Sequence, residues 1–213
     1  MDLHLGHELL LLHLDDANGK GRLSESLLSA AYGGSVLSQW RLDGQLVEVE
    51  PRSYRLAERG SRWGSLQAAE SVMPDRPASI AVLLEALQGW RASNRYGPAL
   101  KELHQLGCVE PEKDRLLGLP WRTRWPERDG EVEQALIQRL RGHVAGDPAL
   151  PADRSDALLG ILVAVGLLDS VWSAEELEAL EAPIEARAKL AAVGMVVRNL
   201  VKVERMLSGV PKL

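Results

Sequence analysis

The chain is poor in cysteine and in aromatic residues. Among 213 residues there is one cysteine and no phenylalanine, and aromatic residues make up 4%. Because Cys108 has no second cysteine to pair with, small disulfide-stabilised secreted domains are excluded, and a reducing compartment fits the chain. Leu106 and Val109 lie close to it in sequence, so we expect Cys108 to be a small buried apolar residue and not a nucleophile.

Long apolar runs are also missing. The longest, residues 157–168, is about half of the ~20 residues that a membrane-spanning helix needs. The amino end carries Asp2 and no basic stretch, and Asp15 and Asp16 interrupt the apolar residues that follow, so we see no secretion signal. With 46% hydrophobic and 26% charged residues, the composition predicts one globular domain over residues 1–213, located in the cytoplasm.

The motifs of common catalytic and metal sites are absent. There is no Gly-x-Ser-x-Gly, no phosphate-binding loop and no dinucleotide fingerprint. His7-Glu8 begins a His-Glu-x-x-His pattern, but position 11 is Leu11, so the second metal ligand is missing. His4 and His7 could share a helix face, but without a carboxylate partner to complete a ligand set they are interpreted as surface or cap residues. The sequence therefore predicts no enzyme, no metal and no cofactor, and a net charge of -5 disfavours a nucleic-acid partner.

Apolar spacing and turn residues predict a mainly α fold with small β-hairpins. Ser24 has the side chain and position of an N-cap, and Ser173 with Glu176 forms a capping box. The predicted helices cover residues 3–14, 24–42, 78–88 and 98–106, and four more begin at Asp129, at Asp153 or Ser155, at Ser173, and near Ile184. The predicted hairpins cover residues 45–57 and 115–125.

The segment 115–125 has the most informative composition in the chain. It places three leucines and two tryptophans among three arginines, with no acidic residue. Gly118 and Pro120 disfavour a long helix or a buried strand, so we expect the apolar side chains on a turn. Exposed leucine and tryptophan beside arginine suit a bilayer interface, with rings and aliphatic groups in the headgroup region and guanidinium groups at the phosphates. The alternative is a hairpin folded over its own core, with solvated arginines at its flanks.

Several segments, in this order, resemble the Golgi phosphoprotein 3 family. The first is HELLLLHLDDANGK, and it is followed by GSVLSQWRLDGQL, LHQLGCV and RWPERD. The segments lie at residues 7–20, 34–46, 103–109 and 124–129, and an apolar helix at 156–169 is also in place. The resemblance covers nearly the whole chain. It implies a central helix bundle surrounded by amphipathic helices, and a non-enzymatic peripheral membrane protein that binds phosphatidylinositol 4-phosphate.

Family members also carry a hydrophobic hairpin that inserts into the bilayer. By order along the chain, the resemblance assigns Leu116, Leu117, Leu119 and Trp121 to that hairpin. The family's headgroup pocket uses a tryptophan and three arginines, whereas the matching positions here are Ser24, Gly33, Ser93 and Tyr96.

Contact with anionic lipid is therefore assigned to other arginines. Arg115, Arg122 and Arg124 flank the hairpin, and Arg22, Arg91 and Arg95 could rebuild a cationic pocket, unless they are ordinary solvated surface residues. The predicted function is binding of anionic lipid, phosphoinositide included, by a protein peripherally associated with the membrane. The alternative is a protein-interaction or homo-oligomerisation module that uses the same hairpin without lipid.

Overall fold

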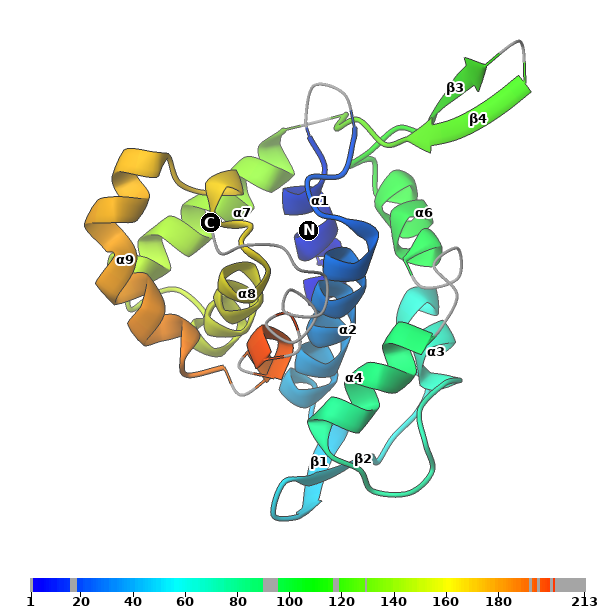
Figure 1. The fold of residues 1–213 in the computed structure, drawn as a ribbon, viewed down its shortest axis with the longest axis vertical. Helices are drawn as coiled ribbons and strands as arrows, with labels where there is room; N and C mark the ends of the chain where they lie inside the picture. Colours follow the sequence, from blue (N-terminus) through cyan, green and yellow to red (C-terminus); the bar gives the residue numbers. More distant parts are fainter. Residues whose placement is uncertain are drawn as a thin grey trace.

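The computed structural model describes residues 2–15, 19–89, 96–116, 119–128, 130–191, 193–194, 196–199 and 201, with the backbone alone for 114–116 and 119–122. Helix α2 (Glu25–Leu42) lies at the centre and packs against α1 (Leu5–His13), α4 (Ile80–Gly89) and α8 (Ala152–Val165) (Figure 1). This arrangement confirms the predicted mainly α fold around a central helix bundle.

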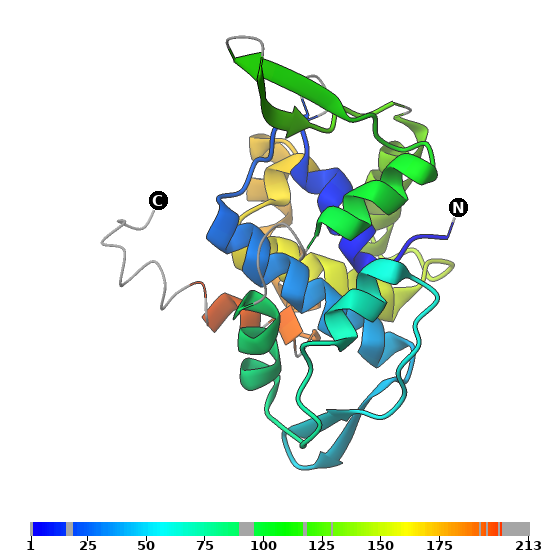
Figure 2. The same ribbon diagram turned by 90° about the vertical axis from the view of Figure 1, so that its right-hand side faces the viewer.

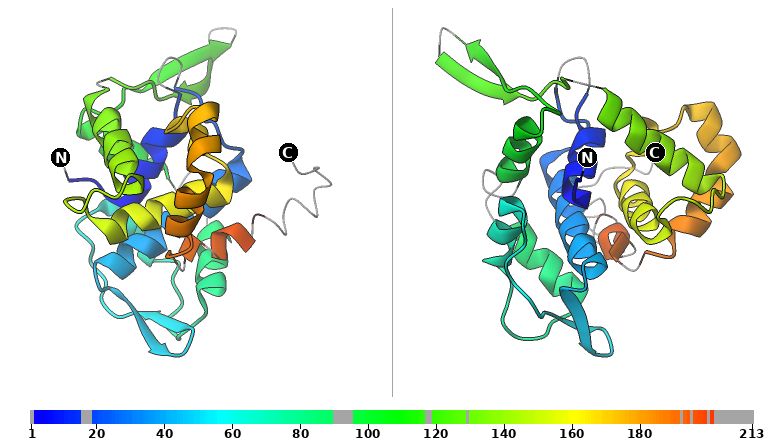
Figure 3. Two further views of the ribbon diagram at one scale, coloured as in Figure 1. Left: turned by 90° about the vertical axis from the view of Figure 1, so that its left-hand side faces the viewer. Right: turned by 180° about the vertical axis from the view of Figure 1, so that it is seen from behind.

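The remaining helices lie on two sides of α2. Figures 1 and 3 show α7 and α9 on the side of α8, and α3 and α6 on the side of α4. Their bounds are Gly64–Glu70 for α3, Gly97–Gln105 for α6, Glu131–Val144 for α7 and Ala174–Ala188 for α9, with a short 3-10 helix, η1, at Leu168–Ser170.

Two glycines in the middle of α2 let neighbouring segments approach closely. A Cβ atom on Gly33 would lie 2.7 Å from Leu84 Cδ1 of α4, and one on Gly34 would lie 2.6 Å from Val197 Cγ2. Both distances are under 3.0 Å, so a side chain at either glycine would require Leu84 or Val197 to shift. These close contacts accompany the burial of α2 along most of its length.

Replacing Gly34 by leucine is expected to destabilise the protein by about 1–3 kcal/mol, because the added side chain overpacks the contact with Val197. Urea denaturation measures this loss. A suitable control is Gly89→Ala, since no atom lies within 4 Å of the added Cβ. Equal stabilities of the Gly34→Leu variant and the wild type would show that the contact is not tightly packed.

Two antiparallel hairpins lie at opposite ends of the long axis (Figures 1 and 2). Strand β1 (Leu46–Glu50) pairs with β2 (Ser53–Leu56), with Leu46 opposite Leu56. Strand β3 (Glu112–Leu116) pairs with β4 (Leu119–Arg124), with Glu112 opposite Arg124. Both predicted hairpins are confirmed.

The Ser24 N-cap and the Ser173 capping box are present as predicted, but other helix boundaries differ. The prediction of a new helix near Ile184 is wrong, because α9 continues through Pro183 and buries Ile184 and Ala188 against the core. Helix α8 begins at Ala152, directly after Pro151, and not at Asp153 or Ser155. For α7 the N-cap is Gly130, and Asp129 lies outside the described residues. Helix α3, whose N-cap Trp63 makes no side-chain cap bond, was not predicted.

Candidate functional site

The β3–β4 hairpin extends away from the helices in every view (Figures 1, 2 and 3). Its register pairs Leu116 with Leu119 and Arg115 with Pro120, after a register shift between Asp114 and Arg115. The backbone of Leu116, Leu119 and Trp121 is thus part of the projecting hairpin. Leu117, which was assigned to the same hairpin, lies outside the described residues.

Backbone hydrogen bonds hold the base of the hairpin to the helical body. The N–H of Trp125 donates to the carbonyl of Gly19 at 3.3 Å, which ties β4 to the loop between α1 and α2. On the other side, the N–H of Arg128 donates to the carbonyl of Cys108 at 2.9 Å. Cys108 is buried, as predicted, so the hairpin rests on a fixed base.

A pocket of about 340 Å³ lies at this base and is called the base pocket below. It is lined by five leucines, by Gly19 and Gly21 of the loop between α1 and α2, by Thr123 and Trp125, and by His13, Glu25 and Tyr96. The pocket therefore combines apolar walls with three polar side chains from α1, α2 and the start of α6.

The polar side chains of the base pocket are held in defined positions. The hydroxyl of Tyr96 donates to the carboxylate of Glu25, and Nδ1 of His13 accepts from the N–H of Leu23 at 3.2 Å. Burial, and after it the positive charge of Arg22, lowers the pKa of His13 to about 4. His13 is therefore neutral at pH 7, and the charged side chain in the described lining of the pocket is Glu25.

Of the six predicted cationic side chains, the structure describes those of Arg22 and Arg124. Arg22 is exposed next to the base pocket. Arg124 lies at the end of β4, where a guanidinium nitrogen is 3.5 Å from a carboxylate oxygen of Glu112. For Arg115 and Arg122 only the backbone is described, and Arg91 and Arg95 lie outside the described residues.

The positions that match the family's headgroup ligands are also placed. Ser24 caps α2, Gly33 packs against Leu84, and Tyr96 lines the base pocket. Ser93 lies outside the described residues. None of these residue types carries a positive charge.

Sequence reasoning missed a buried polar cluster formed by His4, His7, Ser65 and Glu102. Nε2 of His7 donates to Glu102 Oε2 at 2.9 Å, and Ser65 donates to Glu102 through its hydroxyl at 2.5 Å and its N–H at 2.9 Å. His4 caps α1, as interpreted, but neither histidine lies on the surface. Their carboxylate partner is more than 90 residues away, so no local pattern could indicate it.

The ligand atoms of His4, His7 and Glu102 lie within 4.8 Å of one another, as in a metal site. However, Nδ1 of His4 accepts from the N–H of Gly6 at 3.0 Å, so the neutral ring carries its proton on Nε2, which faces Ser65. His7 likewise presents an N–H to Glu102. Although burial raises the pKa of Glu102, hydrogen bonds from His4, His7 and Ser65 outweigh it and lower that pKa. We therefore assign the cluster to hydrogen bonding and not to metal binding.

These features place the chain in one structural class: mainly α proteins that carry a projecting β-hairpin with a pocket at its base. The model of the Golgi phosphoprotein 3 (GPP34) family matches residues 5–203, and the chain belongs to this family. No curated protein matches the chain. Within the described part of the chain, none of the helices has the length and apolarity needed to cross a bilayer.

Proposed function

We propose that the protein is a non-enzymatic peripheral membrane protein of the cytoplasm that docks on anionic bilayers through the β3–β4 hairpin. The observation that carries this proposal is the projection of a leucine- and tryptophan-containing segment, flanked by arginines, away from the helical body. In such a segment the apolar groups enter the boundary between headgroups and acyl chains, while the guanidinium groups stay at the lipid phosphates.

The proposed binding needs both an apolar and an electrostatic contribution. Each buried CH₂ group contributes about 0.8 kcal/mol, so a few leucines and one tryptophan give only marginal, reversible association. Each arginine near an anionic surface adds about 1 kcal/mol. We therefore assign Leu116, Leu117, Leu119 and Trp121 to insertion, and Arg115, Arg122 and Arg124 to the lipid phosphates.

Recognition of phosphatidylinositol 4-phosphate is the finer proposal that family membership implies. Because Ser24, Gly33 and Tyr96 carry no positive charge, such recognition would depend on Arg22, Arg91 and Arg95. The carboxylate of Glu25, which lines the base pocket, would repel the phosphate of such a headgroup. The charge of the bilayer surface is therefore the better supported determinant of binding.

Leu117→Asp combined with Trp121→Ala is expected to lower partitioning onto anionic vesicles by about tenfold or more, because it removes two apolar anchors and adds a charge that lipid phosphates repel. Co-sedimentation with phosphatidylglycerol vesicles, with and without phosphoinositide, measures the loss. The control is Val49→Asp, which adds the same charge at a 41% exposed valine of the opposite hairpin. If the double variant and the wild type pellet equally on anionic vesicles, the hairpin is not the docking element.

The alternative is a protein-interaction or oligomerisation module, since the same projecting hairpin can meet another protein chain. Salt separates the two functions: it weakens lipid binding that depends on arginine, and it preserves or strengthens an apolar protein interface. Light scattering at low and high salt, with the same two variants, measures the oligomeric state. Salt-resistant oligomers that the double variant cannot form, together with no binding to any vesicle, would support the alternative.

A further inference from the structure

A second pocket, of about 530 Å³, lies between the neighbouring helices α2 and α8 and is called the α2–α8 pocket below (Figure 1). Each helix contributes three lining residues at positions i, i+3 and i+4, so one face of each helix forms a wall. These residues are Ser38, Arg41 and Leu42 of α2, and Asp153, Asp156 and Ala157 of α8. The segment that follows α9 completes the lining with Leu190, Ala191 and Val193.

Three side chains bring oxygen acceptors to this pocket that the described part of the protein does not use. Asp156 is nine-tenths buried, and Nε2 of His143 donates to its Oδ1 at 2.6 Å, which fixes the carboxylate and leaves its second oxygen without a partner among the described residues. Ser38 is 4% exposed, and its hydroxyl makes no hydrogen bond to the described residues, nor does the carboxylate of Asp153. A ligand that donates several N–H groups would satisfy these acceptors.

The positive charge of the α2–α8 pocket is separate from its negative charges. Arg41 is exposed in the last turn of α2, and across the described ranges its guanidinium forms no hydrogen bond or ion pair. It therefore does not pair with Asp153 or Asp156, although all three side chains line the same pocket. Unpaired charges of both signs in one pocket favour a ligand that carries both.

Apolar side chains form much of the remaining lining. Leu190 is 67% exposed, more than any other large apolar residue that the structure describes, and Leu42 is 38% exposed. Both line the α2–α8 pocket beside the buried Val193. An aliphatic group bound there would remove the two exposed leucines from water, which favours binding.

We propose that the α2–α8 pocket binds a free aliphatic α-amino acid such as leucine. The carboxylate of the ligand pairs with the guanidinium of Arg41, because this group binds carboxylates through two parallel hydrogen bonds. The ammonium of the ligand donates its three N–H groups to Ser38, Asp153 and Asp156. The aliphatic side chain covers the two exposed leucines, and the volume of about 530 Å³ lies in the range of small-molecule pockets.

Two simpler classes of ligand fit the pocket less well. An aliphatic amine leaves the guanidinium of Arg41 without a counter-charge, and an aliphatic carboxylic acid brings a negative charge to Asp153 and Asp156. Binding in this pocket does not require membrane docking, because Arg41 lies in the last turn of α2 whereas the base pocket lies at its first.

Titration of the whole chain with leucine, followed by ¹H–¹⁵N NMR, tests this site. We expect millimolar leucine to shift the amide signals of Ser38, Arg41 and Asp156. Arg41→Gln should weaken leucine binding by about tenfold or more, through the loss of charge-assisted hydrogen bonds. The control is Arg55→Gln, which removes an exposed positive charge from β2 and should keep the wild-type affinity.

Isoamylamine separates the contributions of the two charges, because it has the ammonium and the aliphatic group of leucine but no carboxylate. It should bind the wild type more weakly than leucine does, and Arg41→Gln should not weaken it further. Asp153→Asn should weaken both ligands. Arg41 and Asp153 are exposed, so neither substitution disturbs the core, and unchanged amide signals far from the pocket verify this.

Three results would each overturn the proposal. The first is the absence of shifts in the wild type at millimolar leucine. The second is an equal affinity of the wild type and of Arg41→Gln for leucine. The third is isoamylamine that binds the wild type as tightly as leucine does, which would show a site for amines and not for amino acids. None of these results bears on vesicle binding through the β3–β4 hairpin, so the proposed function is tested separately.

Discussion

Replacing Glu8 by alanine should lower the free energy of unfolding by about 3–5 kcal/mol, the cost of breaking a buried ion pair from one side. Glu8 is buried in α1, and its carboxylate accepts two hydrogen bonds from Arg139 of α7, at 2.8 and 2.7 Å. Nε of Arg154, in α8, donates to the same carboxylate at 2.9 Å. Without Glu8, two partly buried guanidinium groups would lose their counter-charge and three helices would lose a shared contact.

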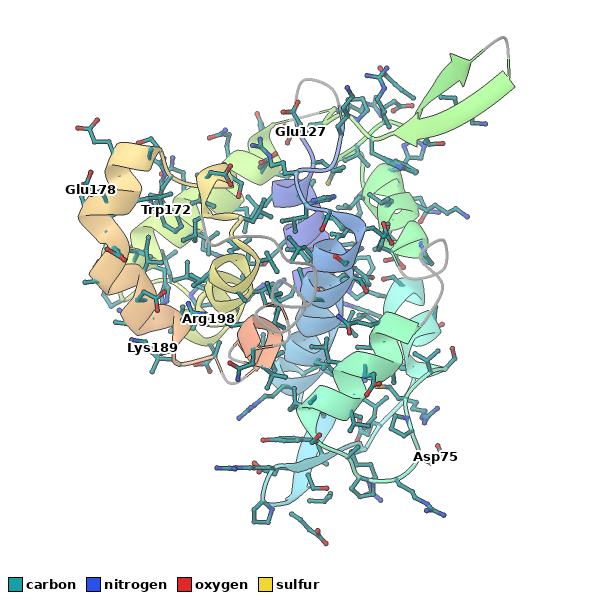
Figure 4. All side chains as sticks on the ribbon, viewed as in Figure 1. Asp75, Glu127, Trp172, Glu178, Lys189 and Arg198 are labelled. Atoms are coloured by element: carbon teal, nitrogen blue, oxygen red, sulfur yellow. The ribbon has the colours of Figure 1, made fainter. Side chains whose placement is uncertain are left out.

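Urea denaturation of the Glu8→Ala variant measures this effect. The matched control is Asp75→Ala, which also removes a carboxylate that pairs with an arginine, here Arg59 at 3.0 Å. Asp75 is 96% exposed on the loop before α4 (Figure 4), so its removal should cost about 0–1 kcal/mol. Similar losses in the two variants would mean that burial of the Glu8 network contributes little.

The second large effect that we expect is a fall in the free energy of unfolding of the protein as the pH falls from about 6.5 to about 4. Burial is the main cause that lowers the pKa of His4 and of His13, each to about 4. In the unfolded chain both histidines bind a proton near pH 6.5, whereas in the folded protein they stay neutral until about pH 4. The unfolded state therefore binds more protons in this window, and each histidine costs up to about 1.4 kcal/mol per pH unit.

Below this window Glu102 adds to the acid sensitivity. Its pKa is lower in the folded protein than the ordinary value of 4.5 for a glutamate, so its stabilising contribution is present above about pH 4.5 and is lost as the pH falls towards the folded-state pKa. Acid unfolding should therefore occur in one continuous decline that begins near pH 6.5.

Urea denaturation at a series of pH values measures this decline. His13→Asn removes one of the two titrating groups, while the amide oxygen can still accept the N–H of Leu23. The variant should show about half of the wild-type slope between pH 6 and pH 5. An unchanged slope would exclude His13 as a source of the acid sensitivity.

The features predicted correctly from the sequence depend on residues close together in the chain. Ser24 bonds to the N–H of Leu27, three residues on, and each hairpin joins two neighbouring strands. The incorrect predictions concern helix boundaries, which depend on packing between residues that are far apart in the sequence. A new helix was predicted near Ile184, yet α9 continues through Pro183 and buries Ile184. Helix α3 was not predicted, and its N-cap makes no side-chain hydrogen bond that the sequence could have indicated.

The same distinction applies to the candidate site. The composition of residues 115–125 indicated the hairpin, because its leucines, tryptophans and arginines all lie within this one short segment. The base pocket brings together Leu10, Glu25, Tyr96 and Trp125 from four separate parts of the chain, so no local pattern could predict it.

Helix α2 determines how far the two ends of the molecule stand apart. Its 18 residues span about 27 Å, from the base pocket at its first turn to the β1–β2 hairpin that follows its last. If the β3–β4 hairpin docks on a bilayer as proposed, α2 would hold the β1–β2 hairpin at a distance from the lipid. A partner bound there would sit in water at a fixed height above the membrane, beyond the reach of the lipid headgroups.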